Sequence, residues 1–180
     1  MIETFRMQQL LRETITTPYR CMVTRPTGAA IRGRIESALS ATPSCVTALL
    51  DFGEVELIDF SCADEVVAKL LLGGADGGPY FVLRGLRHQQ VEAVEHVLNH
   101  HRLAVTTMPP EAGRPAVLGC ADADARDAFG SICDDGPADA KTLADRLGWE
   151  RERAAHAIEA VAALRLARME GGSLHPVPLP

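Results

Sequence analysis

Two hydrophobic patterns alternate over the first two thirds of the chain. Short, mostly apolar runs are typical of buried strands, and they are separated by segments whose apolar residues recur at helical spacing. This alternation predicts an α/β fold around a central sheet with at least partly parallel strands. The expected strands are residues 19–25, 46–52, 55–59, 80–83 and 103–107, and the expected helices are residues 27–39, 61–71 and 91–98.

Two segments flank this regular region. Before residue 15, the positions of Phe5, Leu10 and Leu11 fit either a helix or a strand. After a break rich in Pro and Gly, the apolar residues 116–118 predict an edge strand.

From residue 122 onward the pattern contains helices and then a hairpin. Helical spacing predicts helices over residues 127–133, 139–147 and 150–164. Two short strand-like runs then flank Gly171-Gly172, the signature of a tight hairpin turn. Three helices followed by a two-stranded wing form the arrangement of a winged helix, a small α+β domain. We therefore expect two domains, residues 1–120 and 121–180.

The first domain carries a recognisable run of residues. The sequence LDFGEVELIDFSCADE at residues 50–65 resembles the core of STAS domains, the anti-sigma-factor-antagonist modules of bacterial partner switching. It is most similar to a STAS-like group of unassigned function, and residues 25–39 also resemble the helix that precedes this run. The resemblance spans about residues 15–110. It implies a mixed sheet with helices, and a protein partner such as a histidine-kinase-like ATPase or an anti-sigma-type regulator.

The same resemblance points to Ser61. STAS proteins of the partner-switching type have an Asp-Ser-Ser-Gly run whose second Ser is phosphorylated, and Asp59-Phe60-Ser61-Cys62 stands in its place. Asp59 and Ser61 match, whereas Phe60 and Cys62 do not. The resemblance therefore implies Ser61 as a phosphoacceptor with Asp59 beside it. The alternative is that Ser61 is only the N-cap of the helix over residues 61–71, with Asp64 completing a capping box.

The second domain also resembles a known family. Residues 143–155, LADRLGWERERAA, resemble the turn and recognition helix of bacterial winged helix-turn-helix proteins, and residues 164–172, LRLARMEGG, resemble the start of their wing. Such proteins read DNA with polar and basic side chains of the helix and wing. The DNA-contact candidates are Arg151, Arg153, His156 and Arg168.

Charge weighs against DNA as the main partner. The whole chain has a formal net charge of −6, and residues 122–180 hold seven Lys and Arg against eleven Asp and Glu, a net charge of −4. Glu150 begins the expected helix over residues 150–164, where it would lie near the phosphates and repel them. Regulation through a protein partner is therefore the leading hypothesis. The alternative is a DNA-binding transcription regulator whose STAS-like domain senses a signal or forms a homodimer.

The remaining chemistry points away from an enzyme. Glu92, His96 and His100 are spaced four apart, but a solvent-exposed helical face explains that spacing without a metal ion. The glycine-rich residues 73–78 follow a helix and lack the Lys-Ser/Thr end of a phosphate-binding loop. No nucleophile, base and oxyanion site come together in the sequence. We expect no catalytic activity, metal or cofactor.

Composition also bears on where the protein works. The five cysteines form no CxxC pair, which fits a reducing compartment. No apolar run reaches the roughly 18 residues of a membrane span. Glu3 and Arg6 are unlike the start of a signal peptide. The sequence therefore predicts a cytoplasmic protein without a membrane segment, and the two resemblances imply a bacterial one.

Overall fold

The central feature of the fold is a five-stranded sheet. The computed structural model describes residues 1–15, 20–44, 46–74, 77–109 and 113–180. The first four strands in the sheet are parallel, and the fifth pairs antiparallel at the edge. A mixed α/β fold is therefore confirmed, as is a strand over residues 116–118. The strand order is β1 (Ile2–Arg6), β3 (Thr47–Asp51), β5 (Tyr80–Arg84), β6 (Ala104–Met108) and β7 (Ala116–Gly119).

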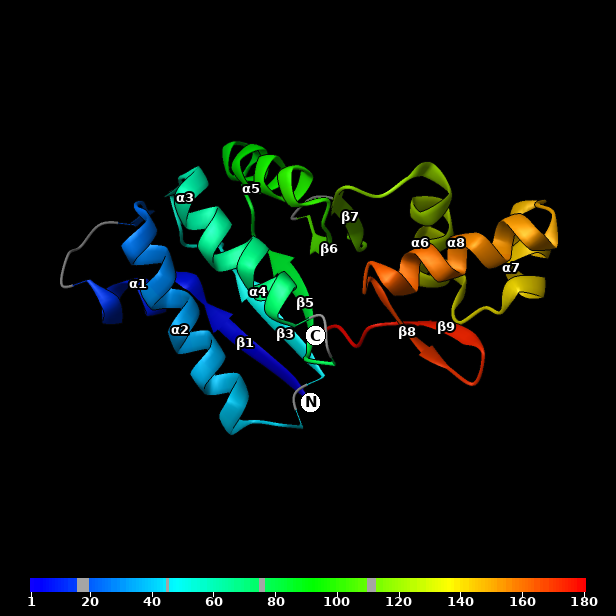
Figure 1. Ribbon diagram of the computed structural model, residues 1–180, viewed down its shortest axis with the longest axis horizontal. Helices are drawn as coiled ribbons and strands as arrows, with labels where there is room; N and C mark the ends of the chain where they lie inside the picture. The colour runs from blue at the N-terminus through cyan, green and yellow to red at the C-terminus, as the bar shows by residue number, and fades with distance from the viewer. Residues whose placement is uncertain (16–19, 45, 75–76, 110–112) are drawn as a thin grey trace.

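Helices cover one face of this sheet (Figure 1). Phe5, Leu50 and Leu83 share one register row and belong to the core beneath the helices. Leu49 and Val82, one position away along their strands, point to the other face because side chains alternate along a strand. The covering helices are α1 (Met7–Thr14), α2 (Arg25–Ala41), α3 (Phe60–Ala63), π-helical η1 (Asp64–Ala68), α4 (Lys69–Gly73) and α5 (His88–His101).

The segment expected to open the central sheet lies outside it. Within residues 19–25, β2 (Cys21–Met22) pairs only with β4 (Leu57–Ile58), in a separate parallel two-stranded sheet. Tyr19 lies outside the described residues. The prediction that residues 19–25 belong to the central sheet is wrong, because β1 takes that place. The ambiguous segment before residue 15 contains a strand followed directly by a helix.

The C-terminal region contributes most of a second hydrophobic core, which also includes Ala104 of β6. The elements of this region are α6 (Ala123–Asp135), α7 (Ala140–Leu147), α8 (Arg151–Ala163) and the hairpin β8 (Ala167–Glu170) and β9 (Ser173–Pro176). The first of these helices begins four residues earlier than expected, because Asp122 accepts a hydrogen bond from the Ala125 N–H at 2.7 Å and caps it. Ala138, between α6 and α7, forms an antiparallel bridge to Leu174 of β9. The backbone N–H groups of these two residues donate to each other's carbonyls at 3.1 and 2.8 Å.

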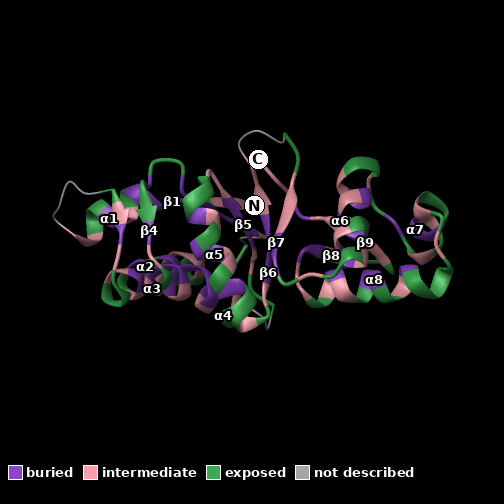
Figure 2. Cartoon of the chain, turned by 90° about the horizontal axis from the view of Figure 1, so that it is seen from above, coloured by how far each residue is buried: buried purple, intermediate pink, exposed green. Residues whose placement is uncertain are grey.

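The end of the chain returns to the sheet. Figure 1 shows the segment after β9 running back to the region of the N-terminus, and Figure 2 shows the two ends close together from above. Val177 is buried against Leu49 and Val82, on the face of the sheet that the helices leave open. The Thr47 hydroxyl donates to the Pro178 carbonyl at 3.0 Å. The C-terminal segment thus covers part of the second face.

Candidate functional site

Two helices begin side by side around the carboxylate of Asp59. Its Oδ2 accepts a hydrogen bond from the backbone N–H of Thr24, the residue before α2, at 2.9 Å. Its Oδ1 accepts from the Cys62 N–H in the first turn of α3 at 2.7 Å and from the Ser61 hydroxyl at 2.9 Å. Burial disfavours the charged form of Asp59, but these donors outweigh burial and lower its pKa. Asp59 therefore carries a negative charge that holds both helix starts.

Ser61 does not cap its helix. Asp59 occupies the N-cap position, and Ser61 lies within the first turn. The prediction of Ser61 as N-cap is wrong, because the helix begins at Phe60 and the carboxylate of Asp59, three residues before Cys62, accepts the hydrogen bond from the Cys62 N–H. Asp64 forms no capping box either, since it pairs with Arg25 at 3.0 Å and with His101 at 2.7 Å. Phosphorylation of Ser61 stays a prediction.

The backbone next to Asp59 is strained. Thr24 has φ 74° and ψ 142°, a conformation that costs a β-branched residue about 1–3 kcal/mol. The surroundings hold it there, because its N–H binds Asp59 and its carbonyl accepts from the Gly28 N–H at 3.2 Å and the Cys62 thiol at 3.0 Å. Burial raises the pKa of Cys62 to about 12, so its sulfur is a hydrogen-bond donor and not a reactive thiolate.

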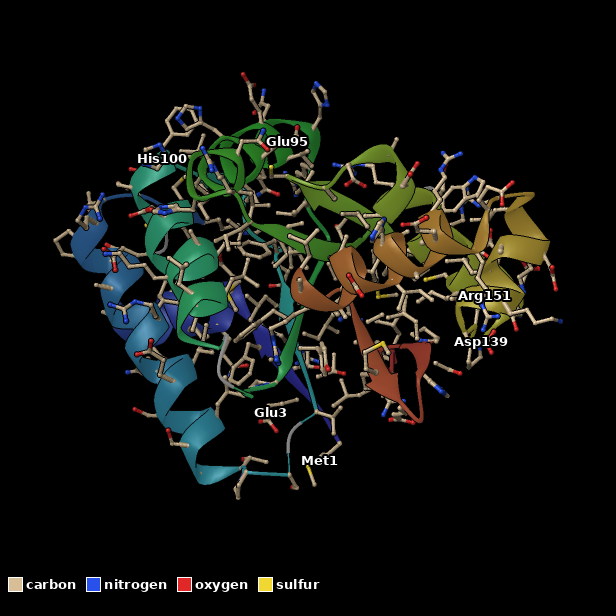
Figure 3. The ribbon with its side chains drawn as sticks, turned by 45° about the vertical axis from the view of Figure 1, so that its right-hand side comes forward. Met1, Glu3, Glu95, His100, Asp139 and Arg151 are labelled. Atoms are coloured by element: carbon tan, nitrogen blue, oxygen red, sulfur yellow. The ribbon has the colours of Figure 1, made fainter. Side chains whose placement is uncertain are left out.

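An open hollow of about 410 Å³ adjoins this junction. Phe60 is 53% exposed, and its ring lies against the ring of His96 with centroids 4.8 Å apart. The hollow thus combines an exposed aromatic ring with a hydroxyl and a partly basic rim. Figure 3 shows His100 and Glu95 projecting outward from α5. We call this region the Ser61 surface, lined by Arg25, Phe60, Ser61, Asp64, His96, Val97, His100 and His101.

A buried carboxylate connects this surface to the helices behind it. The side chain of Glu65 is 4% exposed, and it pairs with Arg25 at 3.0 Å, Arg32 at 3.3 Å and Lys69. Burial opposes its ionisation, but the three cations outweigh burial and lower its pKa. Sequence reasoning missed this cluster. The available signal was a Glu within an apolar stretch, followed four residues later by Lys69.

The four DNA-contact candidates differ in whether a neighbouring carboxylate binds their side chains. Arg153 forms two bonds to Asp124, at 2.6 and 2.9 Å, and its guanidinium lies 4.2 Å from the centre of the Trp149 ring. Arg168, on β8, is paired with Glu170. Arg151 and His156 are exposed on α8, and Figure 3 shows Arg151 close to Asp139, whose pKa it helps to lower after the larger effect of hydrogen bonds from Thr142. Two of the four basic side chains are thus engaged by neighbouring carboxylates.

The described residues offer no cluster for a metal ion and no helix that could span a membrane. Across the described residues, no three His, Cys, Asp or Glu side chains gather as a group able to hold a metal ion. Glu92, His96 and His100 are exposed on α5. In that same part of the chain, no helix is both long enough and apolar enough to cross a membrane. Comparison with protein-family models, with curated proteins and with solved structures finds no match for this chain.

Proposed function

We propose that this protein is a non-enzymatic bacterial regulator that binds a protein partner through the Ser61 surface. The single observation that carries this proposal is the Asp59 junction, where one carboxylate holds the Ser61 hydroxyl, the start of α2 and the start of α3 beside an open hollow. The resemblance of residues 50–65 to STAS domains supports the same surface and implies a histidine-kinase-like ATPase or an anti-sigma-type regulator as the partner.

Phosphorylation of Ser61 would act directly on this junction. A phosphate adds nearly two negative charges and removes the hydroxyl that donates to Asp59. The start of α3 and the half-exposed Arg25 would attract it, whereas Asp59 and Asp64 would repel it. The bond between Asp59 and Thr24 would therefore be weakened, and the strained start of α2 would be released. This gives Ser61 a route to change the surface that a partner meets.

The partner test uses three variants. Tagged wild-type protein is used to capture partners from a lysate of the native host, and mass spectrometry of the peptide around Ser61 reads its phosphorylation. We expect Ser61→Asp to bind a captured partner about tenfold more weakly, since an added charge faces Asp59 and Asp64. Ser61→Ala and the exposed control Ser37→Asp on α2 should bind like wild type. Equal binding by wild type and Ser61→Asp would exclude the switch.

The C-terminal region is proposed to be a winged helix that passes the signal on. Its helices α6, α7 and α8 precede the two-stranded hairpin of β8 and β9, and a single antiparallel bridge joins Ala138 to Leu174 of that hairpin. Gly148 ends α7 in the left-handed conformation, which gives the tight turn before α8. This order of elements supports the resemblance noted in residues 143–155 and 164–172.

A second candidate function is DNA-binding transcription regulation, with a STAS-like dimerisation or sensing domain. It is favoured by Arg151 and His156, which are exposed on α8, whereas Arg153 is bound by Asp124. A gel shift at low salt, with random-sequence and upstream DNA, tests it. DNA binding predicts a shift that Arg151→Ala weakens and that Arg87→Ala, outside the C-terminal region, leaves unchanged. No shift at low salt would eliminate this candidate.

A further inference from the structure

A small hollow lies where the C-terminal region meets the helices and strands that precede it. One wall includes Leu71 of α4, Phe81 of β5 and Leu103, and the opposite wall includes Leu164 at the end of α8. Leu71, Leu103 and Leu164 are only half-buried, so apolar surface remains open to the hollow. Figure 1 shows the end of α8 directed toward α4. A ligand in this hollow would therefore contact both regions of the molecule at once.

Two arginines line the hollow in an uncommon backbone conformation. Arg102 follows α5 with φ 56°, and Arg165 follows the end of α8 with φ 54°. Among the described residues, three other than Gly have a positive φ, and two of these three line this hollow. Gly or Asn is the usual residue in this conformation after a helix. An unfavourable conformation held by two arginines beside one hollow indicates a use for their charges there.

The hollow carries a positive charge. No Asp or Glu is among the described residues that line it. Arg165 donates to the carbonyls of Gly78 and Pro79. The exposed side chain of Arg102 forms no ion pair with a described residue. The ends of α5 and α8 each contribute about half a negative charge, so the two guanidinium groups leave about one positive charge without a counter-charge.

We propose that this hollow binds a small aliphatic carboxylate, with the carboxylate beside Arg102 and the chain against the apolar walls. One negative charge matches the charge of the hollow. A neutral alkyl ligand would make no use of the Arg102 guanidinium, and both arginines would repel an alkylammonium ion. A wholly polar anion such as phosphate would gain nothing from the apolar walls.

The size of the hollow restricts the length of the chain. Its volume is about 150 Å³. That is well above the roughly 30 Å³ that one water occupies in the liquid and below the roughly 300–1,000 Å³ of pockets for drug-sized molecules. A short-chain acid such as hexanoate fits this range, whereas a long-chain fatty acid or a nucleotide does not.

The test uses hexanoate at neutral pH as the probe. Methyl signals of ¹³C-labelled Leu are followed by NMR during titration, and those of Leu103 and Leu164 are identified by their absence from Leu103→Met and Leu164→Met. We expect both sets of signals to shift and to saturate with one midpoint, because one ligand contacts both walls. Hexan-1-ol keeps the chain without the charge, and acetate keeps the charge without the chain, so each should bind at least about tenfold more weakly.

Two variants of exposed residues locate the bound probe. Arg102→Gln removes the unpaired charge and should weaken hexanoate binding at least about tenfold. Arg12→Gln is its matched control and should bind like wild type, because Arg12 is exposed on α1 and does not line the hollow. Ala163→Leu keeps every charge but fills the hollow from the last residue of α8, so it should abolish binding. Since Arg102 and Ala163 are both exposed, neither substitution removes a buried contact.

Three results would overturn the proposal. Without a saturable shift for hexanoate, the hollow binds no short aliphatic acid. Equal binding of hexanoate and hexan-1-ol shows that the arginines do not recognise the charge. Wild-type affinity in Arg102→Gln or in Ala163→Leu places the probe elsewhere on the protein. None of these results affects the Ser61 surface, so the two proposals stand or fall separately.

Discussion

Asp59 is the N-cap of α3, the position that the sequence pattern predicts for Ser61. Its carboxylate accepts from the Thr24 and Cys62 N–H groups and from the Ser61 hydroxyl, whereas Ser61 only donates to Asp59. A residue that satisfies backbone donors of two helices contributes more to folding than a residue that binds the cap. The stability of this junction therefore depends on Asp59 first.

The two side chains can be compared by substitution. Asp59→Ala should lower the free energy of unfolding by about 1–2 kcal/mol, because two backbone N–H groups lose their acceptor. Ser61→Ala should cost less than about 1 kcal/mol, because Asp59 keeps its other donors. Urea denaturation of both variants measures the difference. A larger loss for Ser61→Ala than for Asp59→Ala would contradict the capping role of Asp59.

Glu65 predicts a pH dependence of stability. Its folded pKa lies below its ordinary value of 4.5, so its stabilising effect is complete above that value and is lost as the pH falls through the folded pKa. Near neutral pH, Glu65→Gln should cost about 1–3 kcal/mol, because Arg25, Arg32 and Lys69 lose a charged partner.

Denaturation at several pH values checks this prediction. The difference between wild type and Glu65→Gln should shrink as the pH drops below 4.5, since Glu65 of the unfolded chain is protonated first and Glu65 of the folded protein is protonated at lower pH. Glu36→Gln is a suitable control, because Glu36 is a more exposed partner of Arg32. A difference that stays constant over the whole pH range would rule out the charge as its cause.

At the scale of elements, α2 and η1 approach each other closely at Gly28. A Cβ added there would lie 2.8 Å from the Glu65 Cβ and 3.0 Å from the Cys62 Cα. Gly33, on the same helix, has nothing within 4 Å of such a Cβ. The contact between α2 and η1 therefore requires Gly at one position and not at the other.

This pair of glycines gives an internally controlled prediction. Gly28→Ala should destabilise the fold by about 1–3 kcal/mol, because the backbone of α3 must move to admit the methyl group. Gly33→Ala should stabilise it by about 0.5–1 kcal/mol through the helix propensity of Ala. Thermal denaturation measures both. Equal effects of the two substitutions would show that helix packing at Gly28 is not limiting.

The elements that could be predicted from the sequence are those whose apolar residues follow a clear helical or strand pattern. Helix α2 and the buried strand β3 follow directly from their patterns of apolar residues. The start of α3 does not, because Ser61 and Asp59 are both good capping residues and only the folded backbone shows which one reaches the Cys62 N–H. The π-helical turn and the pairing of β2 with β4 depend on tertiary packing and leave no local signal.

The same distinction holds for the sites. Ser61 was found through a family motif, whereas Glu65 and Gln8 become visible only when burial is known. A buried charge with three partners and a buried amide with none look alike in a sequence. Glu65 has three partners because the fold brings residues 25, 32 and 69 to it, whereas no described residue bonds to the amide of Gln8.

At the scale of the molecule, the C-terminal region contacts the sheet and the residues next to it at several places, and two of these contacts involve Arg165 and Val177. Arg165 has φ 54°, donates to the carbonyls of Gly78 and Pro79, and stacks over the Tyr80 ring at 4.7 Å. Val177 fills the apolar patch on the second face of the sheet. These contacts give a physical route by which the two regions influence each other.

Substitutions that weaken the contact between the C-terminal segment and the second face of the sheet should lower the free energy of unfolding in proportion to the buried apolar area that they remove. Val177→Ala removes buried methyl groups and should cost about 1–2 kcal/mol. Leu179→Ala, at a partly buried position of the same segment, should cost less. Guanidinium denaturation followed by the fluorescence of Trp149 reports on the C-terminal region. An unchanged midpoint for Val177→Ala would mean that this segment contributes nothing to stability.

The bond between Thr47 and Pro178 also has a consequence for the order of folding during synthesis. The two residues are 131 positions apart, so the ribosome must finish nearly the whole described chain before this contact can form. Until then, Leu49 and Val82 lie on a sheet face that lacks its cover. Newly made protein should therefore pass through a stage in which this apolar patch is open to chaperones or to other nascent chains.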